Sequence, residues 1–147
     1  MSELQIRIIN TSPNLLPEYA TEGSSGMDLR AFVESDITLE PMERKLIPTG
    51  LFIEIPLGYE AQVRPRSGLA LKQGITCLNT PGTIDSDYRG EIKILLINLS
   101  DEKQVIKNSD RVAQLVISKV EKARLLLVQQ LEDSERAAGG FGHTGVH

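Results

Sequence analysis

The chain has 147 residues, of which 40% are apolar and 24% charged, and its formal net charge is −4. This length and composition are typical of one folded domain with a sizeable core, and they exclude a wholly disordered chain. The negative charge disfavours a general nucleic-acid or anionic-membrane binder. Three Phe, three Tyr and no Trp also disfavour a platform on which a long single strand could stack.

A single cysteine, Cys77, excludes an internal disulfide and leaves too few thiolates for a Cys-based zinc site. No apolar run approaches the ~18 residues that a membrane-spanning helix needs. The first residues also lack the basic and then apolar pattern of a signal peptide. We therefore expect a reduced, cytoplasmic setting, with neither a membrane nor a nucleic acid as a direct partner.

Short strand-like stretches follow one another along the chain. Residues 4–8 alternate apolar and polar side chains, which is the period of a half-buried strand. Similar stretches, separated by turn-forming Pro, Gly, Asn and Asp, lie at residues 26–31, 37–39, 45–47, 51–55, 60–63, 91–99, 104–106 and 112–119. Many short strands without long helices predict an all-β sandwich or barrel of the jelly-roll kind.

One short helix is expected over residues 69–73, with Ser67 as its N-cap and Gly74 just after its last turn. Residues 123–131 fit either a helix or a strand, and we favour a strand. From Glu132 onward the sequence is acidic and polar, then Gly-rich, without a core-forming pattern. We therefore expect one core domain over residues 1–131 and a mobile C-terminal tail over residues 132–147.

Two segments near the middle of the chain carry side chains suited to nucleotide chemistry. Residues 65–70 place Arg66 at the start of the expected helix, where free backbone N–H groups attract phosphate. Residues 79–91 are interpreted as a hairpin whose turn lies at Pro81-Gly82 and whose backbone could read a base edge. There Asp85 and Tyr88 suit activation of water beside a stacked ring. Taken singly, a plain helix cap and an acidic turn are the competing interpretations.

Three further segments are less specific when each is taken alone. Asp28 places an acid within an apolar strand, where an inward carboxylate needs a partner or a metal shell. Gln114 alternates in phase with Val112 and so faces the interior or a ligand. The tail combines Arg136 with Gly-rich backbone that can wrap phosphates, although a disordered terminus explains the same pattern.

In this order and spacing, the five segments resemble those of the trimeric dUTP nucleotidohydrolases (dUTPases), from Gly26 to Gly145. The most specific matches are Pro-Arg-Ser-Gly-Leu-Ala at residues 65–70 and Gly-Thr-Ile-Asp-Ser-Asp-Tyr-Arg-Gly-Glu at residues 82–91. The resemblance implies a jelly-roll subunit of a homotrimer whose three active sites are each built from all three chains. It also implies a Mg²⁺-dependent dUTP diphosphatase: water attacks the α-phosphorus of dUTP, giving pyrophosphate and dUMP, which keeps uracil out of DNA and supplies thymidylate synthesis.

The resemblance further implies roles for individual residues. Asp85 would activate the attacking water, and Arg136 would clamp the γ-phosphate. Asp28 would hold Mg²⁺ through water, and Tyr88 would stack on the deoxyribose and exclude a 2′-OH. The other implied contacts are Arg66, Ser67, Gly68 and Gln114 on the phosphates, Asn79, Thr83 and Ile84 on uracil, Lys93 at its periphery, and Phe141 and Gly142 from another chain's tail, with Phe141 covering the base.

Departures from the family pattern are small. Ala137 and Ser109 stand where the family usually has glycine, and His143 stands where serine is common. A nucleotide-binding regulator without turnover is one alternative, which Asp85 and Arg136 disfavour. A dCTP deaminase shares the fold, but that family needs a catalytic glutamate and further Ser and Arg residues where this chain has Gly68-Leu69-Ala70.

Overall fold

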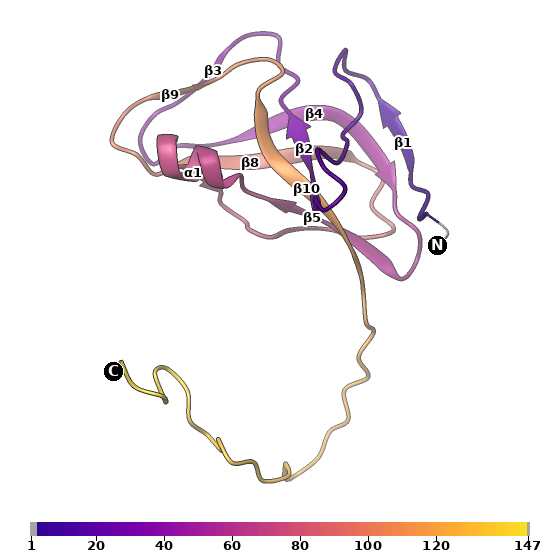
Figure 1. Cartoon of the computed structure of the whole chain (residues 1–147), viewed down its shortest axis with the longest axis vertical. Coiled ribbons are helices and arrows are strands. Elements are labelled where there is room, and N and C mark those ends of the chain that lie inside the picture. The colour runs from indigo at the N-terminus through magenta and orange to yellow at the C-terminus, as the bar shows by residue number, and fades with distance from the viewer. Residues whose placement is uncertain (1–2, 147) are drawn as a thin grey trace.

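The structure is a computed structural model that describes residues 3–146. The described chain forms two four-stranded antiparallel sheets, with strand orders β1-β4-β8-β6 and β2-β10-β5-β7, and a two-stranded ribbon of β3 and β9 (Figure 1). The elements are β1 (Arg7–Asn10), β2 (Gly26–Arg30), β3 (Ile37–Leu39), β4 (Arg44–Glu54), β5 (Tyr59–Arg64), α1 (Ser67–Gln73), β6 (Ile75–Cys77), β7 (Gly82–Ile84), β8 (Glu91–Asn98), β9 (Gln104–Ile106) and β10 (Arg111–Lys119). The expected all-β jelly-roll class with one short helix is confirmed.

The core lies between the two sheets, and strand alternation builds it. In β8, Ile92, Ile94 and Leu96 are at most 1% exposed, whereas Lys93 between them is exposed. Each such buried side chain contributes roughly 1.5–3 kcal/mol through removal of apolar surface from water. The buried Asn98 at the end of β8 donates to the carbonyls of Leu39 (2.9 Å) and Glu102 (2.7 Å), which ties the β3–β9 ribbon to the first sheet.

Strand β4 is longer than the sequence predicts, because it continues through Pro48 and Gly50. Its pairing with β8 shifts register between Pro48 and Phe52, so a bulge takes the place of the expected chain break. Side chains satisfy the polar groups of this bulge: the Thr49 hydroxyl donates to the Ile92 carbonyl (2.6 Å), and the Gly50 N–H donates to the Glu91 carboxylate (3.1 Å). The two predicted strands at 45–47 and 51–55 are therefore one.

Helix α1 is confirmed, but its N-cap is wrong by one residue. Arg66 is the N-cap, with an extended backbone and no side-chain cap, and Ser67 is the first helical residue. Gly74 ends the helix as expected: its φ of 64° is left-handed, and a Cβ there would lie 2.9 Å from the Ser100 nitrogen. Glycine is therefore required at position 74 both by its backbone conformation and by the space available.

After β10 the chain leaves the sheets, and residues 120–146 contain neither strand nor helix (Figure 1). The strand favoured at residues 123–131 is therefore wrong in this single chain. Leu125, Leu126 and Leu127 are 93%, 77% and 98% exposed, and no neighbouring strand satisfies the backbone there. A strand requires a partner, and local sequence cannot supply one. Among the described residues, no helix has the length and apolar character that crossing a bilayer requires.

Candidate active site

Residues 79–91 cross from one sheet to the other. The strands on either side of this segment, β6 and β8, pair antiparallel as in a hairpin, but the expected tight turn at Pro81-Gly82 is wrong: Gly82 begins β7, which pairs with β5 in the second sheet. The cause lies in the core, because Gly82 and Ile84 are buried against the second sheet while Ile92 is buried in the first. A turn closed by the Tyr88 N–H and the Asp85 carbonyl (3.2 Å) lies between the two strands. The crossing opens a gap in which a ligand can lie.

This crossing forms one wall of a pocket of about 320 Å³. Its lining brings together six of the predicted site residues: Asn79, Thr83, Ile84, Asp85, Tyr88 and Lys93. Strand β7 is the last strand of its sheet, so the side of it away from β5 has backbone donors and acceptors that no strand occupies. A pocket of this size with polar backbone on one wall suits a small polar ring.

Tyr88 and Asp85 lie at the mouth of this pocket. Asp85 is exposed directly after β7, and Tyr88 is 45% exposed. The Tyr88 hydroxyl donates to the Glu91 carbonyl at 2.9 Å, which fixes the ring against the start of β8. The Glu91 carboxylate accepts the Gly50 N–H and lies 4.0 Å from the Lys93 ammonium. Sequence reasoning missed Glu91, because its partner Gly50 is far away in the chain.

A second group of predicted residues gathers around Asp28. One carboxylate oxygen of Asp28 lies 3.2 Å from Arg66 Nε, and the other lies 3.4 Å from the Arg111 guanidinium. Arg66 also donates to the Arg111 carbonyl (2.9 Å). Gln114 pairs with Asp28 across β2 and β10, and its amide donates to the Pro65 carbonyl (3.1 Å). Asp28, Arg66 and Gln114 therefore meet at the corner that precedes α1.

This corner is suited to a phosphate chain. Gly68 in the first turn of α1 faces open space, since a Cβ there would meet nothing within 4 Å. The helix start, Arg66 and Arg111 supply N–H donors and positive charge. Arg111 was missed by the sequence analysis, and its only signal is an arginine at the start of a strand, three residues before Gln114.

The donor set at Asp28 fits a magnesium ion held through water. Within residues 3–146 no group of three or more His, Cys, Asp and Glu side chains could enclose a metal directly. Mg²⁺ commonly keeps several waters and uses one or two carboxylates together with substrate phosphates. Asp28, next to a corner suited to phosphates, offers such a carboxylate.

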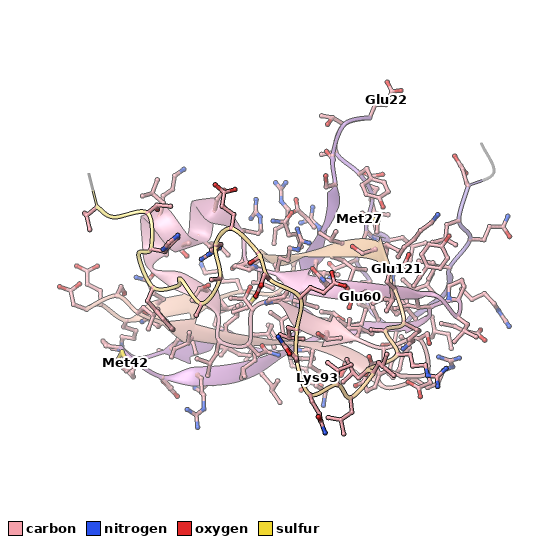
Figure 2. All side chains as sticks on the ribbon, turned by 90° about the horizontal axis from the view of Figure 1, so that it is seen from below. Glu22, Met27, Met42, Glu60, Lys93 and Glu121 are labelled. Atoms are coloured by element: carbon pink, nitrogen blue, oxygen red, sulfur yellow. The ribbon has the colours of Figure 1, made fainter. Side chains whose placement is uncertain are left out.

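Within this chain, the pocket and the Asp28 corner share no lining residue. Met27, the neighbour of Asp28, and Lys93, in the pocket, lie apart in Figure 2. The tail residues stand apart as well: Arg136 donates to the Gly139 carbonyl (2.7 Å), and Phe141 is fully exposed. His147, the end of the expected tail, lies outside the described residues.

Comparisons with known proteins agree over nearly the whole chain. A family model described as dUTPase matches residues 13–145. The deoxyuridine 5'-triphosphate nucleotidohydrolase of Finegoldia magna is 58% identical over 142 residues, covering 97% of this chain and 99% of that protein. The protein of the same name from Treponema denticola is 61% identical over 132 residues, covering 90% of this chain and 92% of that protein.

Solved structures show the same fold. A mutant dUTPase of Staphylococcus bacteriophage 80alpha with dUpNHpp superposes with a TM-score of 0.80 at 26% identity, covering 97% of this chain and 99% of that one. A mutant dUTPase of S. aureus phage phi11, described with a coordinated structural Mg(II) ion, superposes with a TM-score of 0.76 at 23% identity, covering 88% of this chain and 99% of that one.

Proposed function

The chain belongs to the dUTPase family, and from that membership we propose that it hydrolyses dUTP to dUMP and pyrophosphate. One structural observation carries the proposal: the pocket beside the free edge of β7 gathers Asn79, Asp85 and Tyr88 around a space fit for a nucleoside. Asn79 and the backbone of Thr83 and Ile84 bind the uracil edge. A base held this closely by backbone has no room for a 5-methyl group, which excludes thymine.

Asp85 is the general base of the proposed reaction. It stands exposed at the end of β7, at the mouth of the pocket, where an attacking water can reach it. Tyr88 stacks on the deoxyribose, with its hydroxyl fixed by the Glu91 carbonyl. Lys93 also lines the pocket and contacts the base only at its periphery.

The corner around Asp28 holds the triphosphate. Arg66, Ser67, Gly68 and Gln114 supply guanidinium, hydroxyl, backbone and amide donors, and Asp28 would hold Mg²⁺ through water. When bound, Mg²⁺ neutralises charge on the phosphate oxygens, which is the main requirement of phosphoryl transfer. The residues of the chain position the reactants: they orient the phosphates so that the α-phosphorus meets the water at Asp85.

We propose that the chain works as a homotrimer with shared sites, because one chain keeps the pocket, the corner and the tail apart. The exposed apolar segment around Leu125, Leu126 and Leu127 supports this, since such a surface is normally covered by another chain. We place the end of the core domain at residue 131, beyond the last strand of the single chain, and the tail over residues 132–147 brings Arg136, Phe141 and Gly142 to a neighbour's nucleotide. There Arg136 binds the γ-phosphate, and Phe141 covers the uracil.

The setting that we propose is cytoplasmic, with a free nucleotide as the substrate and with neither a membrane nor a nucleic acid as a partner. The lone Cys77, which can form no intrachain disulfide, supports a reduced compartment.

The decisive assay offers dUTP and dCTP to the purified protein with Mg²⁺ and measures pyrophosphate and ammonia. Pyrophosphate from dUTP, without ammonia from dCTP, is expected. Ammonia from dCTP would show that the protein is a deaminase. Binding of dUTP without any product would show that it is a nucleotide-binding regulator. Asp85→Asn, which keeps the shape of the side chain, is the matched control for contaminating phosphatases.

A further inference from the structure

Gly90 lies against the hydroxyl end of the Tyr88 ring. A Cβ built on Gly90 would overlap the hydroxyl and Cζ of Tyr88 and would lie 3.0 Å from its Cε2. Real Cβ atoms do not approach other heavy atoms so closely, so the ring can occupy its position only because residue 90 has no side chain. The backbone of Gly90 is not left-handed, and its conformation alone does not require glycine. The glycine is needed here for space.

Two contacts therefore fix the Tyr88 ring. The bare backbone of Gly90 lies against its hydroxyl end, and the Glu91 carbonyl accepts a hydrogen bond from its hydroxyl at 2.9 Å. The Tyr88 residue is 45% exposed, so its ring is not enclosed by the core. The orientation of the ring at the mouth of the pocket thus depends on the absence of a side chain at position 90 and on the Glu91 carbonyl.

From this geometry we infer that Gly90 determines sugar specificity. Because residue 90 has no side chain, the Tyr88 ring can take the position that closes the space a ribose 2′-OH would need. The inference rests on the proposed function, because it assigns the discrimination between dUTP and UTP to that same pocket. A side chain at position 90 moves the ring and not the fold, because the overlapping atoms are the far end of an exposed side chain.

The test is Gly90→Ala, scored by the ratio of kcat/KM for dUTP to that for UTP. The ratio is expected to fall by roughly tenfold to a hundredfold, the range in which pockets discriminate small groups. Hydrolysis of dUTP is expected to change less than the ratio, because Asp85 and the phosphate corner are untouched. The matched control is Gly23→Ala, where an added Cβ meets nothing within 4 Å and the ratio stays at the wild-type value.

Two further variants show whether Gly90 acts through the ring. Tyr88→Phe loses only the hydrogen bond to the Glu91 carbonyl and is expected to keep most of the discrimination between dUTP and UTP. Tyr88→Ala is expected to lose that discrimination. Adding Gly90→Ala to Tyr88→Ala is expected to change nothing more, because the overlap has gone; a further fall in the ratio would show that Gly90 acts by another route. Ring contacts in wild type and Gly90→Ala are compared by NMR, as cross-peaks between the Tyr88 ring and the α-protons of residue 90, which the variant should lose.

The outcomes separate this inference from the proposed function. A wild-type protein that leaves dUTP intact contradicts the proposed function itself. A wild-type protein that prefers dUTP, with a folded Gly90→Ala that keeps both the ratio and the ring contact, contradicts only the role of Gly90. Loss of the ring contact without a change in the ratio would place the sugar discrimination elsewhere in the pocket. Circular dichroism confirms that each variant is folded.

Discussion

Asp85 is the residue on which turnover is expected to depend most. Its exposed carboxylate at the end of β7 can reach a water, whereas its amide analogue cannot accept a proton. We expect Asp85→Asn to lower kcat by roughly 10²–10⁴, the usual contribution of a general base. Binding of a non-hydrolysable dUTP analogue should change much less, as measured by calorimetry. Normal turnover at saturating substrate would remove Asp85 from the mechanism.

Cys77 makes stability depend on alkaline pH. Burial raises the pKa of its thiol from 9.0 to about 11, so the folded chain holds the neutral thiol more tightly than the unfolded chain does. That stabilisation is fully present below about pH 9 and is lost as the pH rises through about 11. We expect urea midpoints of wild type and Cys77→Ala to differ by a constant amount up to pH 8.5 and to converge between pH 9 and about 11. A constant difference between the two urea midpoints over this whole pH range would contradict the raised pKa of Cys77.

At the scale of elements, Gly68 in the first turn of α1 and Gly74 just after its last turn have different roles. Gly74→Ala strains a left-handed backbone and presses on Ser100, and it should lower the free energy of unfolding by about 1–3 kcal/mol. Gly68→Ala enters open space within the helix, so its higher helix propensity should keep or slightly raise stability. Thermal melts test both. Kinetics should show the reverse order, with the larger rise in KM for Gly68→Ala, since we propose that this position faces the phosphates. A stability loss at Gly68 would contradict this division.

Elements could be predicted from the sequence where their pattern is local. The alternation around Ile92, Ile94 and Leu96 and the Gly74 cap are of this kind. Prediction failed where pairing is distant: Pro48 marks a bulge and not an end, because β8 continues alongside it. The predicted turn at Pro81-Gly82 failed for the same reason: β6 and β8 pair with each other, but the residues that connect them include β7, which pairs with β5 in the other sheet.

In the candidate site, too, residues that are close in sequence could be predicted, whereas residues that act through distant contacts could not. The structure brings the pocket residues together because they come from neighbouring stretches of chain, as the motif around Asp85 and Tyr88 indicated. Arg111 and Glu91 were missed because their roles arise from contacts with Asp28 and Gly50, which only the folded chain places beside them.

At the scale of the whole molecule, the last strand ends at Lys119 and the tail adds no strand or helix to the described core. Truncation before Arg136 should therefore leave the melting temperature nearly unchanged and the trimer intact. Catalysis should fall mainly in kcat, by up to about 10³–10⁵, as for other arginines that meet charge developing during phosphoryl transfer. Melting curves, native mass spectrometry and steady-state kinetics measure the three effects. A truncated protein with full kcat would contradict the role of Arg136.

Shared sites can be tested by mixing two inactive proteins. Asp85→Asn and the truncation before Arg136 are unfolded together and refolded, so that some sites combine an intact Asp85 with an intact tail from another chain. Activity should return to a fraction set by the mixing ratio. Native mass spectrometry confirms that mixed trimers have formed. Mixed trimers as inactive as their parents would show that the tail and Asp85 act within one chain.

The free edge of β7 affects how this protein can evolve. If main-chain groups at positions 83 and 84 read the base alongside Asn79, most substitutions at these two positions keep the reading groups, because every residue other than proline supplies the same N–H and C=O. Selection against thymine is then inherited with the fold and is robust to mutation. With the roles proposed for Tyr88 and Gly90, selection against ribose depends on one ring and on the absence of one methyl group, so a single nucleotide change can remove it. Drift toward ribonucleotides is therefore the easier evolutionary path, and acceptance of thymine requires rebuilding a sheet edge.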